Sequence, residues 1–443
     1  MVSKVLIANR GAIARRVIQT CNRLGLKTVA VYSDADVRAP YLQEATEVAH
    51  LPGNKATDTY INQTALLEIA KLTKADAVHP GYGFLSEDAS FAQAVANSDM
   101  HFVGPSPNWL MQMGDKVNAR QLMQQYNFPT FSGSEIVSTL EQAHEQANHI
   151  GYPVMLKPSG GGGGMGMYRV ESKAELEKAY NQAAHIAEQA FGNGAVYLEQ
   201  WIEQPRHIEY QIIADGRGSA KHVYERECSI QRRHQKLIEE SPAPNVDRKI
   251  LKEIADAAAD TCAKLGYDNI GTMETLVDQH MQTGFLEMNT RIQVEHGVTE
   301  MITGLDLVEV QLALVRGADL PEIPPAEGHA IEARIYAEDP HTLMPSTGRL
   351  STFEIPNLHG IRIDTGYQEG QDITPYYDAM LAKVIAHGQS RELAIGRLLV
   401  ALKAIVINGV TTNIPLLQKV LQSENFMDGK IHPNFIPQMN EHN

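Results

Sequence analysis

Short apolar runs and amphipathic stretches alternate through the first part of the chain. From Val5 to about Gln125 the apolar runs read VLIA, TVAVYS, AVHP and HFVG, and the segments between them have a helical period. This alternation is typical of a parallel sheet with helices on its faces. The pattern therefore predicts a Rossmann-like opening domain of the α/β class.

Ligands of such sheets bind beyond the carboxyl ends of the strands. Asn9-Arg10-Gly11 and Gly81-Tyr82-Gly83 follow apolar runs and fall at that edge. The same residue types also make tight turns. A binding site and a purely structural turn are equally good interpretations of both segments.

The pattern changes twice after this domain. From about Pro129 to Ile202 it predicts a helix, the strand PVMLKPS, a glycine run, a short strand, a long helix through Ala190 and the strand AVYLEQWI, which together form a small α+β module resembling a lid. From Arg206 the strands lengthen and pair as hairpins in HIEYQIIADGRGSAKHVYERECSIQ and ETLVDQHMQTGFLEMNT. The third part is therefore predicted to be mainly antiparallel, and it ends in helices at about residues 391–407 and 414–421.

Composition narrows the possible functions. With 443 residues, of which 43% are apolar, the chain is long enough for two or three domains. Its 53 acidic and 38 basic residues give a net charge of −15, which argues against nucleic acid and against an anionic membrane surface as partners. Any anionic ligand must therefore meet a local basic site.

The cysteines and the apolar runs indicate a cytoplasmic protein. Cys21, Cys228 and Cys262 have spacings that form neither a disulfide framework nor a zinc cluster. No run of about 18 apolar residues is long enough to span a bilayer, and the N-terminal segment lacks the apolar core of a signal peptide. We expect the protein to remain in the reducing cytosol.

A glycine-rich segment follows one of the predicted strands. Met155-Leu156-Lys157-Pro158-Ser159 is followed by five glycines, Gly160 to Gly164, and by Gly166. Backbone amides in such a loop can donate to phosphate oxygens, with Lys157 as a positive partner. The alternative is a flexible linker. The loop is not a Walker motif, because no Gly-Lys-Ser/Thr follows.

Polar and apolar positions mostly alternate along Glu287-Met288-Asn289-Thr290-Arg291-Ile292-Gln293-Val294-Glu295. If this segment is extended, its five odd positions project from one face. Glu274 can lie opposite Glu287 across the preceding hairpin, and two carboxylates with an amide oxygen suit Mg²⁺ bound to nucleotide phosphates. The alternative is a half-exposed strand with solvated charges.

Two further basic features have less specific patterns. Gln231-Arg232-Arg233-His234-Gln235-Lys236 offers the cations that an anionic substrate requires. Arg334 lies within a predicted strand, where it is either paired for structure or directed into a cleft. Periodicity alone does not choose between these two roles of Arg334.

At these residues the chain resembles the biotin carboxylase family of the ATP-grasp superfamily. The resemblance covers nearly the whole chain, through the motifs IANRGAIA, HPGYGFLSE, GDK, KPSGGGGG, ERECSIQRRHQK, EMNTRIQVEH, TEMITG, EARIYAEDP, PYYDAM and NGVTTN. It implies an N-terminal domain at residues 1–114, a linker helix and ATP-grasp lid at 115–203, and an ATP-grasp core with a mainly antiparallel C-terminal domain at 204–443.

The resemblance also implies roles for individual residues. Residues expected to bind ATP are Lys116 and Lys157 at the phosphates, the loop glycines Gly162, Gly163 and Gly164, and Glu199, Trp201, Ile202, His207, Gln231 and His234 around the adenosine. Residues expected to bind Mg²⁺ or Mn²⁺ are Glu274, Glu287 and Asn289. Residues that match the bicarbonate pocket are Lys236, Arg291, Gln293, Val294 and Glu295.

In the mechanism that the family implies, a base matching Glu295 deprotonates bicarbonate, which attacks the γ-phosphate of ATP to give carboxyphosphate. Carboxyphosphate releases CO₂ beside the ureido ring of biotin, phosphate removes the ring proton, and an arginine matching Arg334 stabilises the resulting anion. Implied partners are a separate biotin carboxyl carrier protein, a carboxyltransferase complex and a second copy of the chain. The chain lacks the Ala-Met-Lys-Met site of biotin attachment, and Lys383 lies inside an apolar run.

Four positions depart from the family pattern. Met165 replaces a common arginine, Ala12 a common glutamate, Gly297 a common proline and Gln200 a frequent lysine. None coincides with the metal or bicarbonate positions, so altered nucleotide affinity is expected with catalysis retained. Acetyl-CoA carboxylase of fatty acid synthesis is the expected enzyme system. The alternatives are a subunit of another biotin-dependent carboxylase, another ATP-grasp ligase and a nucleotide-binding regulatory paralogue.

Overall fold

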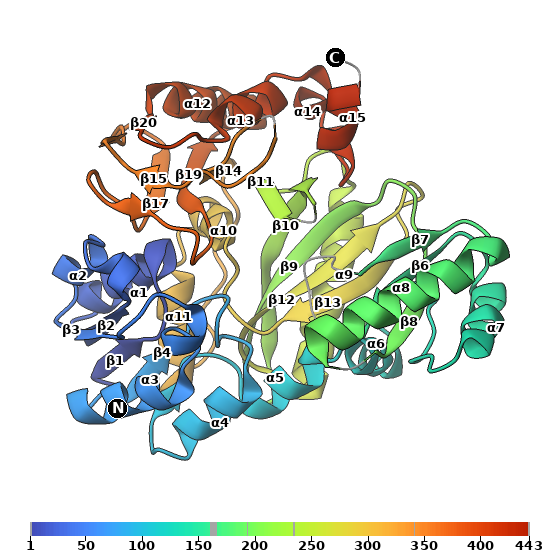
Figure 1. Cartoon of the computed structure of the whole chain (residues 1–443), viewed down its shortest axis with the longest axis horizontal. Helices are drawn as coiled ribbons and strands as arrows, with labels where there is room; N and C mark the ends of the chain where they lie inside the picture. Colours follow the sequence, from blue (N-terminus) through green and yellow to red (C-terminus); the bar gives the residue numbers. More distant parts are fainter. Residues whose placement is uncertain (1, 160–165, 193, 234, 341, 442–443) are drawn as a thin grey trace.

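The N-terminal part is a five-stranded parallel sheet with helices on its faces (Figure 1). The computed structural model describes residues 2–159, 166–192, 194–233, 235–340 and 342–441. The sheet has the order β3-β2-β1-β4-β5, with β1 (Lys4–Ile7), β2 (Lys27–Tyr32), β3 (Glu47–His50), β4 (Ala77–His79) and β5 (His101–Phe102). The accompanying helices are α1 (Gly11–Arg23), α2 (Tyr41–Glu44), α3 (Gln63–Thr73), α4 (Ala89–Ala96) and α5 (Pro107–Gly114).

This arrangement confirms the predicted parallel sheet. Val5, Leu6 and Ile7 are completely buried, as expected for a central strand that is covered on both faces. The edge strand β3 was not predicted, because its residues alternate only between half-buried and exposed.

The lid is a separate small module, seen in green in Figure 1. It contains α7 (Leu140–Ile150), α8 (Lys173–Phe191) and an antiparallel sheet of order β7-β6-β8, with β6 (Val154–Pro158), β7 (Tyr168–Val170) and β8 (Val196–Gln200). Helix α6 (Lys116–Gln125) precedes it. Apolar side chains of β6 and β8, including Val154, Leu156 and Leu198, pack against the two helices in their own core. The predicted order of elements in this module is confirmed.

An eight-stranded sheet forms most of the remaining chain. Its order is β13-β12-β9-β10-β11-β14-β19-β17, and every neighbouring pair is antiparallel, as predicted. The strands are β9 (Arg206–Asp215), β10 (Ala220–Arg232), β11 (Gln235–Ser241), β12 (Asp268–Val277), β13 (Thr283–Asn289), β14 (His329–Tyr336), β17 (Ile361–Thr365) and β19 (Met380–Gly388).

Helices cover this sheet along its length. Helix α9 (Arg248–Leu265) packs on β9 and β10, and α12 (Arg391–Ala404) packs on β19. The other elements are α10 (His296–Thr303), α11 (Leu307–Val315), α13 (Ile414–Leu421), α14 (Glu424–Met427), α15 (Phe435–Glu441), and the short strands β15 (Gly348–Arg349), β16 (Thr352–Glu354), β18 (Asp372–Ile373) and β20 (Val406–Asn408).

Two predicted elements end earlier than expected. The extended segment predicted over residues 287–295 stops at Asn289, and Glu295 occupies the position before the first residue of helix α10 instead. The helix predicted to reach residue 407 ends at Ala404, because Val406–Asn408 forms strand β20 and pairs with β16. In both cases tertiary contacts override the local pattern.

Gly366 marks a close approach between distant parts of the chain. It directly follows β17, and a Cβ atom at this position would overlap the backbone of Gly11 and Ala12 at the start of α1. A side chain here would therefore separate the N-terminal domain from the large sheet.

We predict that Gly366→Ala lowers the free energy of unfolding by about 1–3 kcal/mol, as overpacking against rigid backbone does. Gly396→Ala is the matched control. Gly396 is exposed in α12 with open space around it, so alanine there should stabilise by about 0.5–1 kcal/mol. Thermal unfolding should shift in opposite directions for the two variants, and equal midpoints would contradict the close approach.

Candidate active site

A slot lies where the lid meets the ends of the large sheet. Its volume is about 190 Å³, and six predicted nucleotide residues line it: Lys157, Glu199, Trp201, Ile202, His207 and Gln231. The loop glycines Gly162, Gly163 and Gly164 and the side chain of His234 lie outside the described residues. The slot is therefore built from the lid strands β6 and β8 on one side and β9, β10, β12 and β13 on the other.

Sequence reasoning missed the apolar wall of this slot. Its side chains are Phe131, Met155, Met167, Leu276, Phe285 and Leu286. The last three could have been found from the sequence, because they lie between the two predicted carboxylates of the β12–β13 hairpin. An apolar slot with a few polar groups at its edge is suited to a flat heteroaromatic ring.

One lysine lines the slot, and a second lies near the Glu199 carboxylate. Lys157, in β6, forms an ion pair with Glu199, and Lys116, at the start of α6, forms one with Glu287. Burial favours the neutral carboxyl of Glu199, but the charges of Lys157, Arg120 and Lys116 hold its pKa below the usual range. Each lysine is therefore paired with a carboxylate that an anionic ligand would have to displace.

The predicted pair of carboxylates is confirmed by the strand register. Glu274 in β12 lies directly opposite Glu287 in β13, and Asn289 ends the same strand. The Asn289 amide nitrogen is buried without a hydrogen-bond partner among the described residues. Two carboxylates and an amide oxygen are hard ligands of the kind that Mg²⁺ prefers, so this set fits a magnesium ion.

His207 supports Glu274 from the adjacent strand β9. Its Nε2 lies 2.9 Å from Glu274 Oε2, and its Nδ1 lies 2.8 Å from the amide nitrogen of Gln231. Burial favours a neutral ring, but the Glu274 carboxylate raises the pKa of His207 above its ordinary value. Gln231 donates to Nδ1, which leaves the proton of a neutral ring on Nε2, facing Glu274.

Lys236 connects three buried carboxylates. Its Nζ lies 2.6 Å from Glu209, 2.8 Å from Glu274 and 2.7 Å from Glu295. Arg226, which is completely buried, pairs with Glu209 from the other side. Burial works against the lysine charge, yet the surrounding anionic groups raise the pKa of Lys236 well above its usual value.

Arg334 approaches the same centre from β14. It donates to Glu295 Oε2 over 2.9 Å and forms an ion pair with Glu239, while its Nε–H has no partner in the described part of the chain. Burial alone would raise the pKa of Glu295, but Lys236, Arg334 and Arg226 hold it well below the usual range. Arg334 is therefore paired with two carboxylates and keeps one donor without a partner among the described residues, so the geometry is compatible with both roles that periodicity left open.

Arg291 and Gln293 complete this side of the site. Arg291 donates to Asn289 Oδ1 over 2.8 Å and to Gln293 Oε1 over 2.9 Å, and Gln293 donates to Glu274 Oε1 over 3.0 Å. The carbonyl of Val294 accepts from Lys383. These residues converge although they do not form a strand, because the turn before α10 directs them toward Glu274 and Lys236.

The residues at the carboxyl edge of the N-terminal parallel sheet, for which the sequence allows either a binding site or a turn, have a mainly structural role. Asn9 donates to the carbonyls of Pro80 and Tyr82 over 2.6 and 2.8 Å, and Arg10 pairs with Asp36. Gly81 has a positive φ, and a Cβ there would meet Asn9. The structure favours the turn interpretation for these residues.

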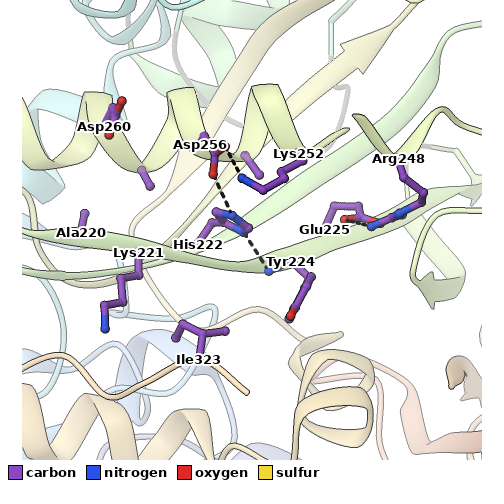
Figure 2. A pocket seen from close by; sticks show the side chains of 12 residues that line it. Ala220, Lys221, His222, Tyr224, Glu225, Arg248, Lys252, Asp256, Asp260 and Ile323 are labelled. Carbon is purple, nitrogen blue, oxygen red and sulfur yellow. Dashed lines mark hydrogen bonds and ion pairs between the residues drawn. The ribbon is translucent and has the colours of Figure 1, made fainter. Parts of the chain in front are cut away.

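A larger hollow of about 770 Å³ lies between β10 and α9 (Figure 2). None of the predicted site residues lines it. Most of its charged groups are paired with each other: Arg248 with Glu225, and Asp256 with both Lys252 and His222. The slot beside Lys157 remains the candidate site, because it adjoins the cluster of charges around Lys236.

Three family models cover almost the whole chain. The Biotin carboxylase N-terminal domain matches residues 1–110, the Carbamoyl-phosphate synthase L chain ATP binding domain matches 115–323, and the Biotin carboxylase C-terminal domain matches 332–438. Biotin carboxylase 2 of Bacillus subtilis is 47% identical over 99% of this chain and 100% of its own length. The chain belongs to the biotin carboxylase family. The predicted class, an ATP-dependent carboxylase ligase, is confirmed with it.

Solved structures of biotin carboxylases share this fold. A β-γ-ATP complex from Campylobacter jejuni has a TM-score of 0.96 at 39% identity and covers 99% of both chains. The biotin carboxylase domain dimer of 2-oxoglutarate carboxylase from Hydrogenobacter thermophilus, in complex with ADP, its magnesium salt and bicarbonate, has a TM-score of 0.96 at 40% identity, covering 100% of this chain and 98% of that one.

The departures from the biotin carboxylase pattern that the structure describes, Ala12, Gln200 and Gly297, are not among the charged residues around Lys236. Gln200 lines the slot, and Met165 lies outside the described residues. Gly297 is in the first turn of α10, where an added Cβ would overlap the Ile385 side chain. No described helix is both long enough and apolar enough to cross a membrane.

We predict that Lys236→Met lowers the free energy of unfolding by about 3–5 kcal/mol, because three buried carboxylates lose their shared cation. Lys252→Met is the matched control, since Lys252 is 69% exposed and pairs with Asp256 at the surface. Lys252→Met should lower the free energy of unfolding by at most about 1 kcal/mol. Urea unfolding of both variants checks the difference, and similar costs would show that Lys236 does not balance the buried charge.

Proposed function

We propose that this chain uses ATP to activate bicarbonate and transfers the carboxyl group to the ureido nitrogen of biotin on a separate carrier protein. The observation that carries this proposal is the position of Lys236 and Arg334 on two sides of Glu295, next to the nucleotide slot. A small anion that enters there meets two cations and one carboxylate base. The Hydrogenobacter relative was solved with ADP, its magnesium salt and bicarbonate, which supports this choice.

ATP is proposed to bind with its base in the apolar slot. The residues assigned to the adenosine are Glu199, Trp201, Ile202, His207, Gln231 and His234. Lys116, Lys157 and the amides of Gly162, Gly163 and Gly164 are assigned to the phosphates, since cations and side-chain-free amides suit phosphate oxygens.

Glu274, Glu287 and Asn289 are the proposed ligands of Mg²⁺, or of Mn²⁺ with the same oxygen set. When bound, the ion neutralises phosphate charge during phosphoryl transfer. His207, Lys236 and Gln293 already hold Glu274 in one orientation. These contacts fix the direction in which its oxygens point.

Bicarbonate is assigned to the space bordered by Lys236, Arg291, Gln293, Val294 and Glu295. Glu295 accepts the bicarbonate proton, a bicarbonate oxygen attacks the γ-phosphorus, and ADP leaves. Carboxyphosphate then divides into CO₂ and phosphate, and phosphate takes the N1′ proton of biotin as N1′ attacks CO₂. Arg334 donates to the enolate-like oxygen of the biotin anion, which is stabilisation of developing charge by a fixed donor.

Biotin is proposed to arrive on another protein. Lys383 is only 1% exposed and contacts Glu332, Asp364 and the Val294 carbonyl, so a biotin ligase has no access to it. A tethered carrier raises the local biotin concentration and adds contacts that free biotin lacks. We further propose a homodimer that works with a carboxyltransferase in the cytosol, where the buried, unpaired Cys21, Cys228 and Cys262 remain reduced.

The final acceptor is proposed to be acetyl-CoA, in the first step of fatty acid synthesis. The independent biotin carboxylases among its relatives, such as that of Bacillus subtilis, support a separate subunit of this type. The Hydrogenobacter relative belongs to a 2-oxoglutarate carboxylase, so the biotin half-reaction alone does not specify the acceptor. Identification of the carboxyltransferase that co-purifies with the chain tests this part.

The central experiment measures ADP release by the purified protein with Mg-ATP and bicarbonate. Three additions are compared: free biotin, a biotinylated carrier and the same carrier without biotin. ADP release and bicarbonate-derived label on the carrier should increase together with the biotinylated carrier and much less with free biotin. Biotin-independent turnover, or turnover that joins another carboxylate to an amine, would contradict the proposal.

We predict that Glu274→Gln and Glu287→Gln each abolish biotin-dependent ATP turnover, because an amide is a poorer ligand of Mg²⁺ than a carboxylate. The exposed Glu253→Gln serves as the control and should retain wild-type activity. Turnover is measured across a magnesium titration. Wild-type magnesium dependence in both site variants would refute the assignment.

We predict that Arg334→Ala reduces carboxybiotin formation by on the order of a hundredfold or more, as loss of an oxyanion donor does. Slow bicarbonate-dependent ATP hydrolysis should survive, because Arg334 is assigned to the later step. Arg334→Lys retains the charge and should lose less. A parallel loss of both activities with unchanged nucleotide binding would show that Arg334 also acts in bicarbonate activation.

A further inference from the structure

Two carboxylates lie side by side behind Arg334. Glu239 in β11 and Glu332 in β14 occupy directly opposite positions of an antiparallel pair, and both are completely buried. Arg334 is in ion-pair contact with Glu239, but no described residue donates a hydrogen bond of normal geometry to any of the four oxygens. Buried carboxylates normally accept several hydrogen bonds, so this pair requires an explanation.

The neighbouring charges do not neutralise both groups. Arg334 forms an ion pair with Glu239 but is shared with Glu295, and Lys383 lies 3.5 Å from Glu332 but equally close to Asp364. The ionisable groups that face Glu239 are Arg334, Glu332, Glu295, Lys236, Tyr336 and Cys228. Those that face Glu332 are Lys383, Arg334, Glu295, Asp364, Glu239 and Tyr82.

One proton shared by Glu239 and Glu332 explains both the missing hydrogen-bond donors and the incomplete neutralisation of their charge. Two adjacent buried carboxylates repel when both are ionised, so one of them retains its proton. A protonated carboxyl can also donate a hydrogen bond, which an ionised carboxylate cannot. Burial, together with the neighbouring carboxylates, raises the pKa of Glu239 to about 8 and that of Glu332 to about 7, even though Arg334 and Lys383 act in the opposite direction.

We propose that Glu239 and Glu332 share one proton at neutral pH and act as positioning residues that leave the Arg334 guanidinium available to the biotin anion. This inference rests on the proposed function of Arg334. With the proton in place, Glu239 and Glu332 carry one negative charge between them, and the unpartnered Nε–H of Arg334 can donate to substrate. When the proton leaves, the doubly charged pair attracts the guanidinium toward β11 and competes with the substrate oxygen.

The test uses Glu332→Gln, which keeps the shape of the side chain and prevents a second negative charge. Carboxylation of carrier-bound biotin by the wild-type protein should decline as pH rises through about 8, while bicarbonate-dependent ATP hydrolysis does not share this decline. In Glu332→Gln this decline should disappear, because Glu239 and the substituted glutamine together never carry more than one negative charge. Glu239→Gln should remove it in the same way, because either change leaves at most one charge.

Glu240→Gln is the matched control on the same strand. Glu240 is also buried, but it accepts hydrogen bonds from His329 and Arg391, and these partners hold its pKa below the usual range despite burial. Its substitution should leave the alkaline decline of carboxylation where it is in the wild type. If Glu240→Gln changed the alkaline decline of carboxylation as Glu332→Gln does, the effect would come from general loss of buried charge, and the proposal would be overturned.

A second readout does not depend on activity. The folded pair retains a proton that unfolded glutamates lose near their ordinary pKa, so folding binds a proton between about pH 5 and 8. The free energy of unfolding of the wild type should therefore fall with rising pH in this window. Its unfolding equilibrium constant should increase by up to about tenfold per pH unit relative to that of Glu332→Gln.

Each combination of outcomes has a definite meaning. If Glu332→Gln shows the wild-type pH dependence of stability, no proton is shared and the proposal fails. If Glu332→Gln changes the pH dependence of the free energy of unfolding but not the alkaline decline of carboxylation, the pair has no positioning role. If wild-type protein gives no biotin-dependent turnover, the proposed function fails, and the stability slope still decides whether the proton is shared.

Discussion

The site depends on the neutralisation of buried carboxylates by Lys236. Glu209, Glu274 and Glu295 come from β9, β12 and the turn before α10, and each lies within 2.8 Å of the same ammonium nitrogen. Without that cation three negative charges would remain close together away from water, which is far more costly than an exposed ion pair. Lys236 thereby fixes where the turn before α10 lies relative to the sheet. The positions of Gln293 and Arg291 follow from that placement, since Gln293 binds Glu274 and Arg291 binds Gln293.

The sequence predicted those parts of the fold and site whose geometry is local. Strand alternation and hairpin turns were enough to place Glu274 opposite Glu287, because antiparallel register follows from the turn between two strands. The same reasoning failed from Arg291 to Glu295, where polar and apolar residues alternate as in a strand but the chain turns into α10. The residues nevertheless converge, through contacts with Lys236 and Arg334 that come from strands distant in the sequence. Such contacts have no local signature.

The apolar wall of the nucleotide slot and the Glu239–Glu332 pair show a second limit of sequence reasoning. Phe131 and Leu276 have the pattern of ordinary core residues, and only their position beside Trp201 and His207 distinguishes them. Glu239 and Glu332 lie in strands whose neighbouring residues are also buried, so alternation does not reveal which face they occupy. Their pairing comes from the order β11-β14-β19 in the large sheet, which joins segments nearly a hundred residues apart. The resemblance to a family supplied the roles of many residues, but not this arrangement.

The cations assigned to anionic ligands are already paired with carboxylates: Lys116 with Glu287, Lys157 with Glu199, Lys236 with Glu295 and Arg334 with Glu239. This pairing keeps a densely charged site stable before substrates bind, since isolated buried cations would be strongly unfavourable. It also implies an order of exchange. Under the proposed assignment, a divalent cation on Glu274 and Glu287 would take carboxylate contacts from Lys236 and Lys116 and leave these lysines better partners for bicarbonate and phosphate oxygens. The proposal therefore predicts that metal, nucleotide and bicarbonate binding are coupled through shared carboxylates, each strengthening the binding of the others.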